Sequence, residues 1–197
     1  MPGRMLKGHA IVHLIDRALE GKPVLRKPAF KAAMMRFLRE GALRFGVDVH
    51  AYVLMDNHMH TLASGRMNVI SKMMQSLKHR FVSAYNRAEN RRGPLFEGRF
   101  QSHRIRTFEY ALDRSYYVHL NPVKAGLAAR PERYRWSSAA AYVGVAPSPT
   151  WLRPVPLWSL LARQAHEAKA QYADAMAQFA RTMNGGYDMD DESSRSA

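Results

Sequence analysis

The first half of the chain carries the apolar patterns of a strand, a helix and a β-hairpin. Residues 9–15 form a short, β-branched apolar run that predicts a strand. The apolar positions over 29–45 recur at helical spacing before Gly46, a residue suited to ending a helix. Residues 47–55 alternate between apolar and polar positions, and residues 58–64 return after an Asp-Asn pair that favours a turn. This half therefore predicts the order strand, helix, strand, strand.

The middle of the chain predicts a second helix, a fourth strand and a third helix. One apolar face runs through residues 68–91, and residues 98–106 have a strand-like composition. Thr107 is a suitable N-cap for a helix that we expect to end near Asn121, because proline at position 122 disfavours its continuation. The resulting order is the split βαβ pattern of an α+β, ferredoxin-like sandwich, in which an antiparallel sheet carries helices on one face. The third helix is an addition to that pattern.

The remaining residues predict a C-terminal helical extension and a polar tail. We expect residues 1–128 to form the main domain and residues 129–186 to pack on it as an extension, with a final amphipathic helix over 157–183. Residues 187–197 are acidic and have no apolar face to bury, so we expect this tail to be disordered in isolation.

Composition adds a strong positive charge to this picture. The 197 residues include 30 Lys and Arg against 16 Asp and Glu, a net charge of +14. The last ten residues hold four of the acids and one of the bases, so the first 187 carry 29 bases and 12 acids. Such an excess is typical of proteins that bind phosphate-rich partners, although ribosomal and membrane-surface proteins share it. Nucleic acid is the expected partner.

Several classes of site are excluded by what the sequence lacks. It has no cysteine, so a metal would be held by His, Asn, Gln or carboxylates. It has no phosphate-binding glycine loop, which argues against a nucleotide cofactor. No segment approaches the roughly 18 apolar residues that span a bilayer, and the N-terminus lacks the pattern of a signal peptide. We therefore expect a soluble, cytoplasmic protein without a membrane partner.

Two histidines one residue apart stand in the second strand of the predicted hairpin. Alternate residues of a strand project from the same face, so His58 and His60 are expected side by side, with Met59 turned into the core. Two imidazoles so placed can ligate one cation, but the short pair by itself also suits two half-exposed surface histidines. A third ligand would decide between these interpretations.

The third predicted helix carries the best candidates for the remaining chemistry. Tyr117 and Asn121 are four residues apart and so lie one above the other on a helix. Tyr116 belongs to the apolar stripe of the same helix and is expected to pack in the core. Alternatively, Tyr117 is an amphipathic surface residue and Asn121 merely ends the helix before a proline. Next to the apolar stripe, the same predicted helix has a polar stripe, which consists of Tyr110, Asp113, Arg114, Tyr117 and Asn121.

Basic residues gather between residues 78 and 106, with aromatic residues among them. The segment holds eight Lys or Arg residues against two Glu, together with Phe81, Tyr85, Phe96 and Phe100. Cations that follow a phosphate backbone and rings that stack on bases suit single-stranded nucleic acid. The alternative is that the aromatics are core residues and the charges form a solvated face.

Four stretches of the sequence resemble a known family. HAYVLMDNHMH, PLFEGRFQSHRI, YVHLNPVKAGL and YRWSSAAAYVG occur in the order and at the spacings of the single-tyrosine HUH transposases, and in particular resemble the REP-associated tyrosine transposases. The resemblance covers roughly Lys7 to Gly144, most of the chain. The Asp56-Asn57 pair departs slightly from the family's usual residues. This departure lies at the predicted turn and does not affect the residues that would bind a metal.

This resemblance implies a metal-dependent endonuclease and strand transferase of single-stranded DNA. His58, His60 and Asn121 would hold Mg²⁺ or Mn²⁺, and Tyr117 would attack a phosphodiester to form a 5′-phosphotyrosine intermediate. The implied partner is single-stranded or hairpin DNA of the repetitive extragenic palindrome (REP) type. The residues expected to contact this DNA are Lys78, Arg80, Arg87, Arg99, Arg104, Arg106, Arg135 and Trp136.

Two other functions stay open on the sequence. A non-catalytic protein that holds structured DNA or RNA would share the charge and the fold, with a vestigial histidine site. A two-histidine phosphoesterase would need two separated His-x-Thr/Ser motifs, which this sequence does not supply. We expect a monomer, with a homodimer as the alternative. We also hypothesise that the acidic residues 187–192 fold back over the basic site and compete with DNA.

Overall fold

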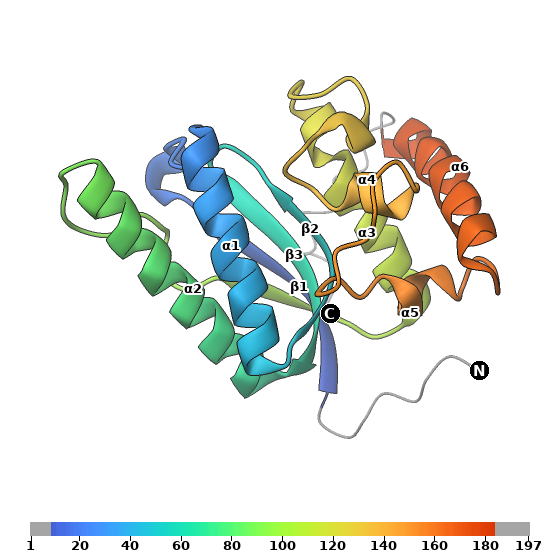
Figure 1. The fold of residues 1–197 in the computed structure, drawn as a ribbon, viewed down its shortest axis with the longest axis horizontal. Coiled ribbons are helices and arrows are strands. Elements are labelled where there is room, and N and C mark those ends of the chain that lie inside the picture. Colours follow the sequence, from blue (N-terminus) through green and yellow to red (C-terminus); the bar gives the residue numbers. More distant parts are fainter. Residues whose placement is uncertain (1–8, 184–197) are drawn as a thin grey trace, which may run out of the picture.

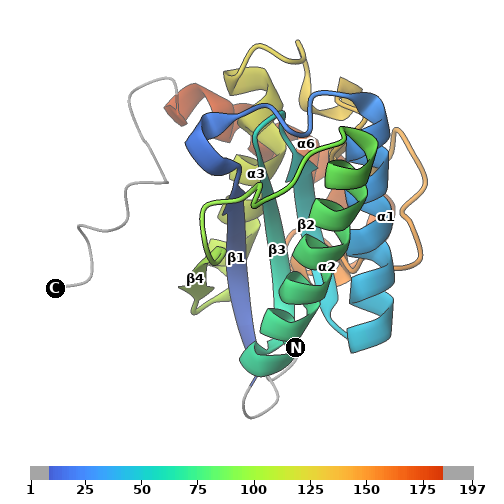
Figure 2. The same cartoon turned by 90° about the vertical axis from the view of Figure 1, so that its left-hand side faces the viewer.

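The fold is a four-stranded antiparallel sheet with helices on both faces (Figures 1 and 2). The structure is a computed structural model that describes residues 9–183. The strand order is β2-β3-β1-β4, so the first strand lies in the middle of the sheet and the last at its edge. The strands are β1 (His9–Arg17), β2 (Asp48–Leu54), β3 (His58–Arg66) and β4 (Gln101–Ile105).

The helices divide between the two faces of the sheet. Helices α1 (Pro28–Phe45) and α2 (Met67–Ala88) pack side by side on one face. Helix α3 (Phe108–Lys124) lies on the other face, with α4 (Ala139–Tyr142), α5 (Val155–Trp158) and α6 (Ala165–Met183) beside it. Short 3-10 turns, η1 (Leu19–Gly21) and η2 (Pro131–Arg133), complete the fold. The α+β class is confirmed, with the two sandwich helices on one face and the added helix on the opposite one.

Local sequence signals account for the main boundaries. Helix α1 ends where Gly46 adopts the left-handed conformation at φ 63°, which a residue without Cβ reaches easily. Helix α3 begins where Thr107 accepts a hydrogen bond from the backbone N–H of Tyr110 at 3.1 Å. The apolar stripe of α2, from Ile70 to Phe81, is buried against α1 and the sheet. These three features were predicted from the sequence and are confirmed.

Two predicted helix limits are wrong. Helix α3 continues through Pro122 to Lys124, because a proline near the end of a helix removes only the hydrogen bond to the carbonyl of Val118. The single helix predicted over 157–183 is two helices, α5 and α6, separated by residues 159–164. The chain turns there so that α6 returns against α3, which one straight helix would not allow.

A buried polar network joins α6 and α4 to α3. The hydroxyl of Tyr172 lies 2.8 Å from Nδ1 of His119 and 2.8 Å from Oγ of Ser115, and Nε2 of His119 lies 2.7 Å from Oγ of Ser138. A neutral imidazole donates from one nitrogen and accepts at the other, so His119 satisfies both neighbours. The network shows why part of the extension packs on the core, while the domain limits at 128 and 186 stay a prediction.

The two ends of the chain lie outside this description. The predicted acidic tail, residues 187–197, and its proposed contact with the basic site fall among residues that the structure does not describe. Within residues 9–183 no helix combines the length and the apolar character needed to cross a membrane.

The buried His119 should make stability depend on pH. Burial lowers its pKa from 6.5 to about 3, so between these values the unfolded chain binds a proton that the folded chain does not. The free energy of unfolding should therefore fall as the pH drops below 6.5, by about 1.4 kcal/mol per unit for each such histidine. His119→Gln should reduce the loss between pH 6.5 and 5, measured by urea unfolding. The exposed His79→Gln is the control, and equal slopes in both variants would contradict the assignment.

Candidate active site

Three histidines gather on the sheet face that α3 covers. His58 and His60 project from the same side of β3, with ring centroids 4.9 Å apart, while Met59 is fully buried on the other side. His13 on β1 lies beside them, its ring stacked on that of His60 at 5.0 Å. The predicted pairing of His58 and His60 on one face is thus observed, and His13 is a neighbour that the sequence analysis did not identify.

In both β3 histidines, Nδ1 takes part in a hydrogen bond. Nδ1 of His58 lies 2.7 Å from Oδ1 of Asn57, whose amide nitrogen donates to the carbonyl of Gly21 at 3.3 Å. Nδ1 of His60 lies 2.9 Å from Nε2 of His13. Nε2 of His60 is buried and has no hydrogen-bond partner within the described part of the chain. An imidazole held at Nδ1 with Nε2 unused is the arrangement of a metal-ligating histidine.

The protonation states also suit metal binding. Burial, with smaller effects from the positive charge of Arg114 and from His103, lowers the pKa of His13 to about 3. Burial, followed by the neighbouring His13 and His58, lowers the pKa of His60 well below its usual 6.5. Both rings are therefore neutral at physiological pH, and only a neutral imidazole offers a lone pair to a cation.

Tyr117 reaches this cluster from α3. Only 1% of its surface is exposed, and its ring meets those of His60 and His13 edge-on, with centroids 5.7 and 6.1 Å away. The preceding residue, Tyr116, turns away and packs on Tyr172 at 4.7 Å, as its place in the apolar stripe predicted. Tyr117 is therefore not a surface residue. Helix α3 brings its ring to the histidine-bearing face of the sheet.

Asn121 lies one turn further along α3. Its side chain is mostly buried, and Nδ2 donates to the backbone carbonyl of Tyr117 at 2.8 Å. With the amide nitrogen engaged, the carbonyl oxygen Oδ1 is the atom left for another partner, and amide oxygens are suitable ligands for Mg²⁺ and Mn²⁺. The structure ties Asn121 to Tyr117, and its role as a ligand stays a prediction.

The chemistry of the predicted donors suits a divalent cation. Within residues 9–183, no three histidine or carboxylate side chains converge as a metal site. The predicted set is different, since it combines the imidazoles of His58 and His60 with the amide of Asn121. The unpartnered, buried Nε2 of His60 is the observation that favours a cation there, because a buried nitrogen without a partner is otherwise costly.

Two cations beside Tyr117 were missed as site residues. The guanidinium carbon of Arg114 lies 6.0 Å from the centre of the Tyr117 ring, and Nε of Arg114 donates to the hydroxyl of Tyr110 at 2.9 Å. Nζ of Lys124 lies 5.4 Å from the same ring. Arg114 is almost fully buried, which a charged side chain tolerates only with specific partners. The sequence feature that could have identified Arg114 is its spacing of three residues from Tyr117, which places both on one face of a helix.

Comparison with known proteins now identifies the family. The model of the family described as "Transposase IS200 like" matches residues 7–116. The chain belongs to the IS200-like transposase family. The match includes His13, His58 and His60 and ends one residue before Tyr117. The search of the curated proteins found no match to this chain.

Two solved structures are similar to this chain. A REP-associated tyrosine transposase bound to a REP hairpin is similar to it at 17% identity and a TM-score of 0.59, covering 77% of this chain and 88% of that one. A protein from Deinococcus radiodurans R1 described as a candidate transposase covers 58% of this chain and 93% of its own, at 20% identity and a TM-score of 0.42. At such identities the first of these supports the fold.

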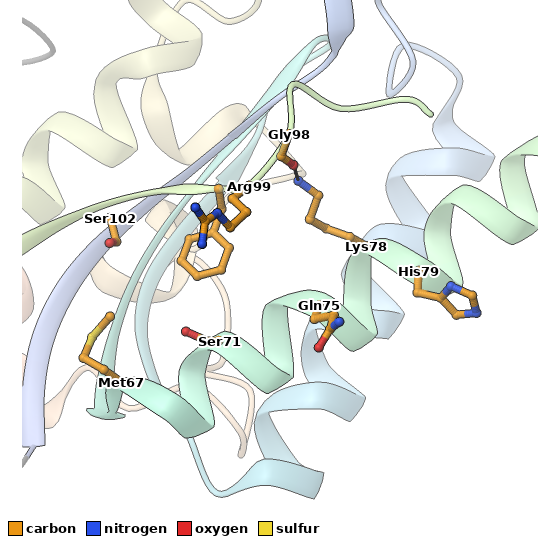
Figure 3. Close-up of a pocket in the computed structure, with 9 residues that line it drawn as sticks. Met67, Ser71, Gln75, Lys78, His79, Gly98, Arg99 and Ser102 are labelled. Carbon is orange, nitrogen blue, oxygen red and sulfur yellow. Dashed lines mark hydrogen bonds between the residues drawn. The ribbon is translucent and has the colours of Figure 1, made fainter. Parts of the chain in front are cut away.

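Two of the predicted DNA-binding residues line a cleft on the other side of the sheet. The cleft has a volume of about 720 Å³ and lies between α2 and the segment that enters β4 (Figure 3). Ser71 and Gln75 lie on the α2 wall, and Arg99 and Ser102 lie opposite them. Lys78 lies at the same cleft with its Nζ donating to the carbonyl of Gly98 at 2.9 Å. The cleft combines cations, polar groups and, from Phe100, an aromatic ring.

The other predicted DNA-binding residues are scattered. Arg80 pairs with Glu40 and stacks on Phe37 on the outer surface of the two sandwich helices. Arg135 stacks on the half-buried Trp136, near the end of β2. The remaining three, all exposed, are Arg87, Arg104 and Arg106.

Lys78 pairs with a buried carboxylate, whereas the acidic partner of Arg80 is exposed. Its Nζ lies 2.6 Å from Oδ1 of Asp16, a carboxylate only 1% exposed whose pKa is raised by burial and lowered in opposition by Lys78. Lys78→Met should lower the free energy of unfolding by about 3–5 kcal/mol, because it leaves a buried carboxylate unpaired. Urea unfolding measures the change.

Two further variants distinguish the effect of losing the ion pair from the effect of changing the shape of the side chain. The double change Asp16→Asn with Lys78→Met should recover part of the lost stability, and Arg99→Met, an exposed residue of the same cleft, should change it little. A Lys78→Met variant as stable as the parent would show that the pair contributes nothing.

Proposed function

We propose that this protein is a metal-dependent endonuclease and strand transferase that acts on hairpin-forming single-stranded DNA through a 5′-phosphotyrosine at Tyr117. The observation that carries the proposal is the buried phenol ring of Tyr117 against His60, with His58 beside it. Family membership supports DNA as the substrate, as does the net charge of +14. The fold shared with a transposase bound to a REP hairpin supports a hairpin substrate.

In this reaction the phenol oxygen of Tyr117 attacks the phosphorus of the scissile phosphodiester. The phenol gives up its proton as the new Oη–P bond forms and the bond from phosphorus to the 3′ oxygen breaks, and the departing strand takes up a proton to leave with a 3′-hydroxyl. The phosphodiester is preserved as a 5′-phosphotyrosine, so a 3′-hydroxyl can attack it and rejoin DNA without ATP. Burial of the ring beside His60 and His13 holds the nucleophile in one orientation.

His58, His60 and Asn121 would hold Mg²⁺ or Mn²⁺ beside this tyrosine. When bound, the cation would polarise the scissile phosphate and neutralise charge on its non-bridging oxygens. Arg114 and Lys124, which flank the Tyr117 ring, would attract the phosphate from the protein side. The imidazole and amide donors suit Mn²⁺ and other first-row ions at least as well as Mg²⁺.

The DNA would contact both faces of the sheet around its β4 edge. Ser102 lines the cleft on the α2 side, whereas the next residue, His103, has its ring 6.2 Å from that of His13 on the α3 side. Only the edge strand β4 separates the two surfaces, with Arg104 exposed on the strand and Arg106 exposed just after its end. A strand held at Arg99 in the cleft would therefore reach Tyr117 by passing this edge. We also propose a monomer, with a homodimer as the alternative.

Trapping the covalent adduct tests this function. The full chain is incubated with Mn²⁺ and a 3′-labelled DNA hairpin that carries single-stranded flanks, and denaturing gels detect labelled DNA attached to protein. The parent should form an adduct that digestion and mass spectrometry place on the peptide containing Tyr117. Tyr117→Phe should abolish the adduct and leave hairpin affinity unchanged, because the substitution removes only the nucleophilic oxygen.

The neighbouring tyrosine provides the matched control. Tyr116→Phe removes the same atom from a ring that packs on Tyr172, so its adduct should resemble that of the parent. Binding of hairpin DNA or RNA by the parent without any adduct would instead favour the non-catalytic binding protein. An adduct on a peptide other than that of Tyr117 would contradict the assignment of the nucleophile.

A further inference from the structure

His13 makes a contact that the proposed reaction does not use. It is fully buried on β1, where Ile15 pairs with His60 on β3, so the two histidines lie diagonally on the same face of the sheet. Nε2 of His13 is 2.9 Å from Nδ1 of His60, and the rings are nearly parallel, with planes 21° apart. A hydrogen bond of this length between two buried rings requires one nitrogen to carry a proton and the other to offer its lone pair.

This bond couples the tautomers of the two rings. If Nδ1 of His60 donates, then Nε2 of His60 carries a lone pair and His13 carries its own proton on Nδ1. If Nε2 of His13 donates instead, then His60 must carry its proton on Nε2 and cannot bind a cation there. Both Nδ1 of His13 and Nε2 of His60 are buried and without hydrogen-bond partners in the described part of the chain, so ordinary hydrogen bonding does not select the tautomer.

His58, the other proposed histidine ligand, indicates which tautomer the metal site requires. Nδ1 of His58 lies 2.7 Å from the amide oxygen of Asn57, and the contact of the Asn57 amide nitrogen with Gly21 fixes the orientation of that amide. An amide oxygen only accepts, so His58 carries its proton on Nδ1 and offers Nε2. A cation shared by His58 and His60 requires the same tautomer of His60.

We propose that His13 is a positioning residue that accepts the Nδ1 proton of His60 and so holds Nε2 of His60 ready for the cation. This inference rests on the proposed metal site. His13 is not itself a third ligand beside the other two histidines, since no three such side chains converge on a common point within residues 9–183. As a neutral acceptor, it orients His60 without placing a negative charge beside the scissile phosphate, as a carboxylate in this position would do.

The tautomer itself is directly measurable in the unmodified protein. In the full chain labelled with ¹⁵N-histidine, long-range ¹H–¹⁵N correlation spectra distinguish a proton on Nδ1 from one on Nε2. With Mg²⁺ added, His60 and His13 should both carry their protons on Nδ1. A His60 ring protonated on Nε2 would overturn the proposal, whether or not any variant folds.

Metal affinity of matched variants gives the second test. His13→Met removes the acceptor and should weaken Mn²⁺ binding by about 10–100-fold, measured by electron paramagnetic resonance of the free ion, with folding checked by circular dichroism. His13→Gln keeps an acceptor oxygen and should recover part of the affinity. His103→Gln changes the half-exposed histidine next to His13 and should leave Mn²⁺ binding unchanged.

The outcomes separate this inference from the proposed function. A folded His13→Met variant that binds Mn²⁺ as tightly as the parent would overturn the role of His13 while leaving the metal site intact. A parent protein that binds no Mn²⁺ would overturn the metal site, and the role of His13 with it. Loss in His13→Met with recovery in His13→Gln would support both.

Discussion

The contact between the Tyr117 ring and the histidines of the central strands is the interaction on which the rest of the site depends. It is made by α3, which is not one of the two sandwich helices and packs on the opposite face of the sheet. The helix is held there from the far side by Tyr116 and by the buried network of His119, Tyr172 and Ser138. Residues of the C-terminal extension therefore support the site indirectly, because they pack on the helix that carries the tyrosine.

The site contains buried polar and charged side chains that reduce the stability of the fold. Arg114, His13 and His60 are all almost fully buried, although transfer of charged and polar side chains out of water generally costs free energy. Replacing buried ionic groups by apolar residues of similar volume is often neutral or stabilising in proteins. A sequence that keeps such groups in its core, next to a buried tyrosine, departs from the rules of stability in a way that is expected where function constrains the residues.

Much of this arrangement follows from local periodicity, and the remainder depends on long-range pairing. The two-residue repeat of a strand places His58 and His60 together, and helical spacing separates Tyr116 from Tyr117. No local pattern shows that β1 lies beside β3 in a register that brings His13 against His60, so this contact was missed. Likewise, the effect of Pro122 was misjudged because a proline close to the end of a helix costs little, and the break before α6 depends on packing against α3. The basic segment divides between ion pairs and a cleft, a division that charge counting does not reveal.

The most direct test of the account is electron spin-echo spectroscopy of Mn²⁺ bound to the full chain, with histidine nitrogen labelled. We expect modulation from the imidazole nitrogens of both His58 and His60, with that of His60 lost in His60→Ala and that of His58 retained. Mn²⁺ bound with no imidazole coupling, or with couplings that survive replacement of both histidines, would contradict the claim that the cation and Tyr117 share this face of the sheet.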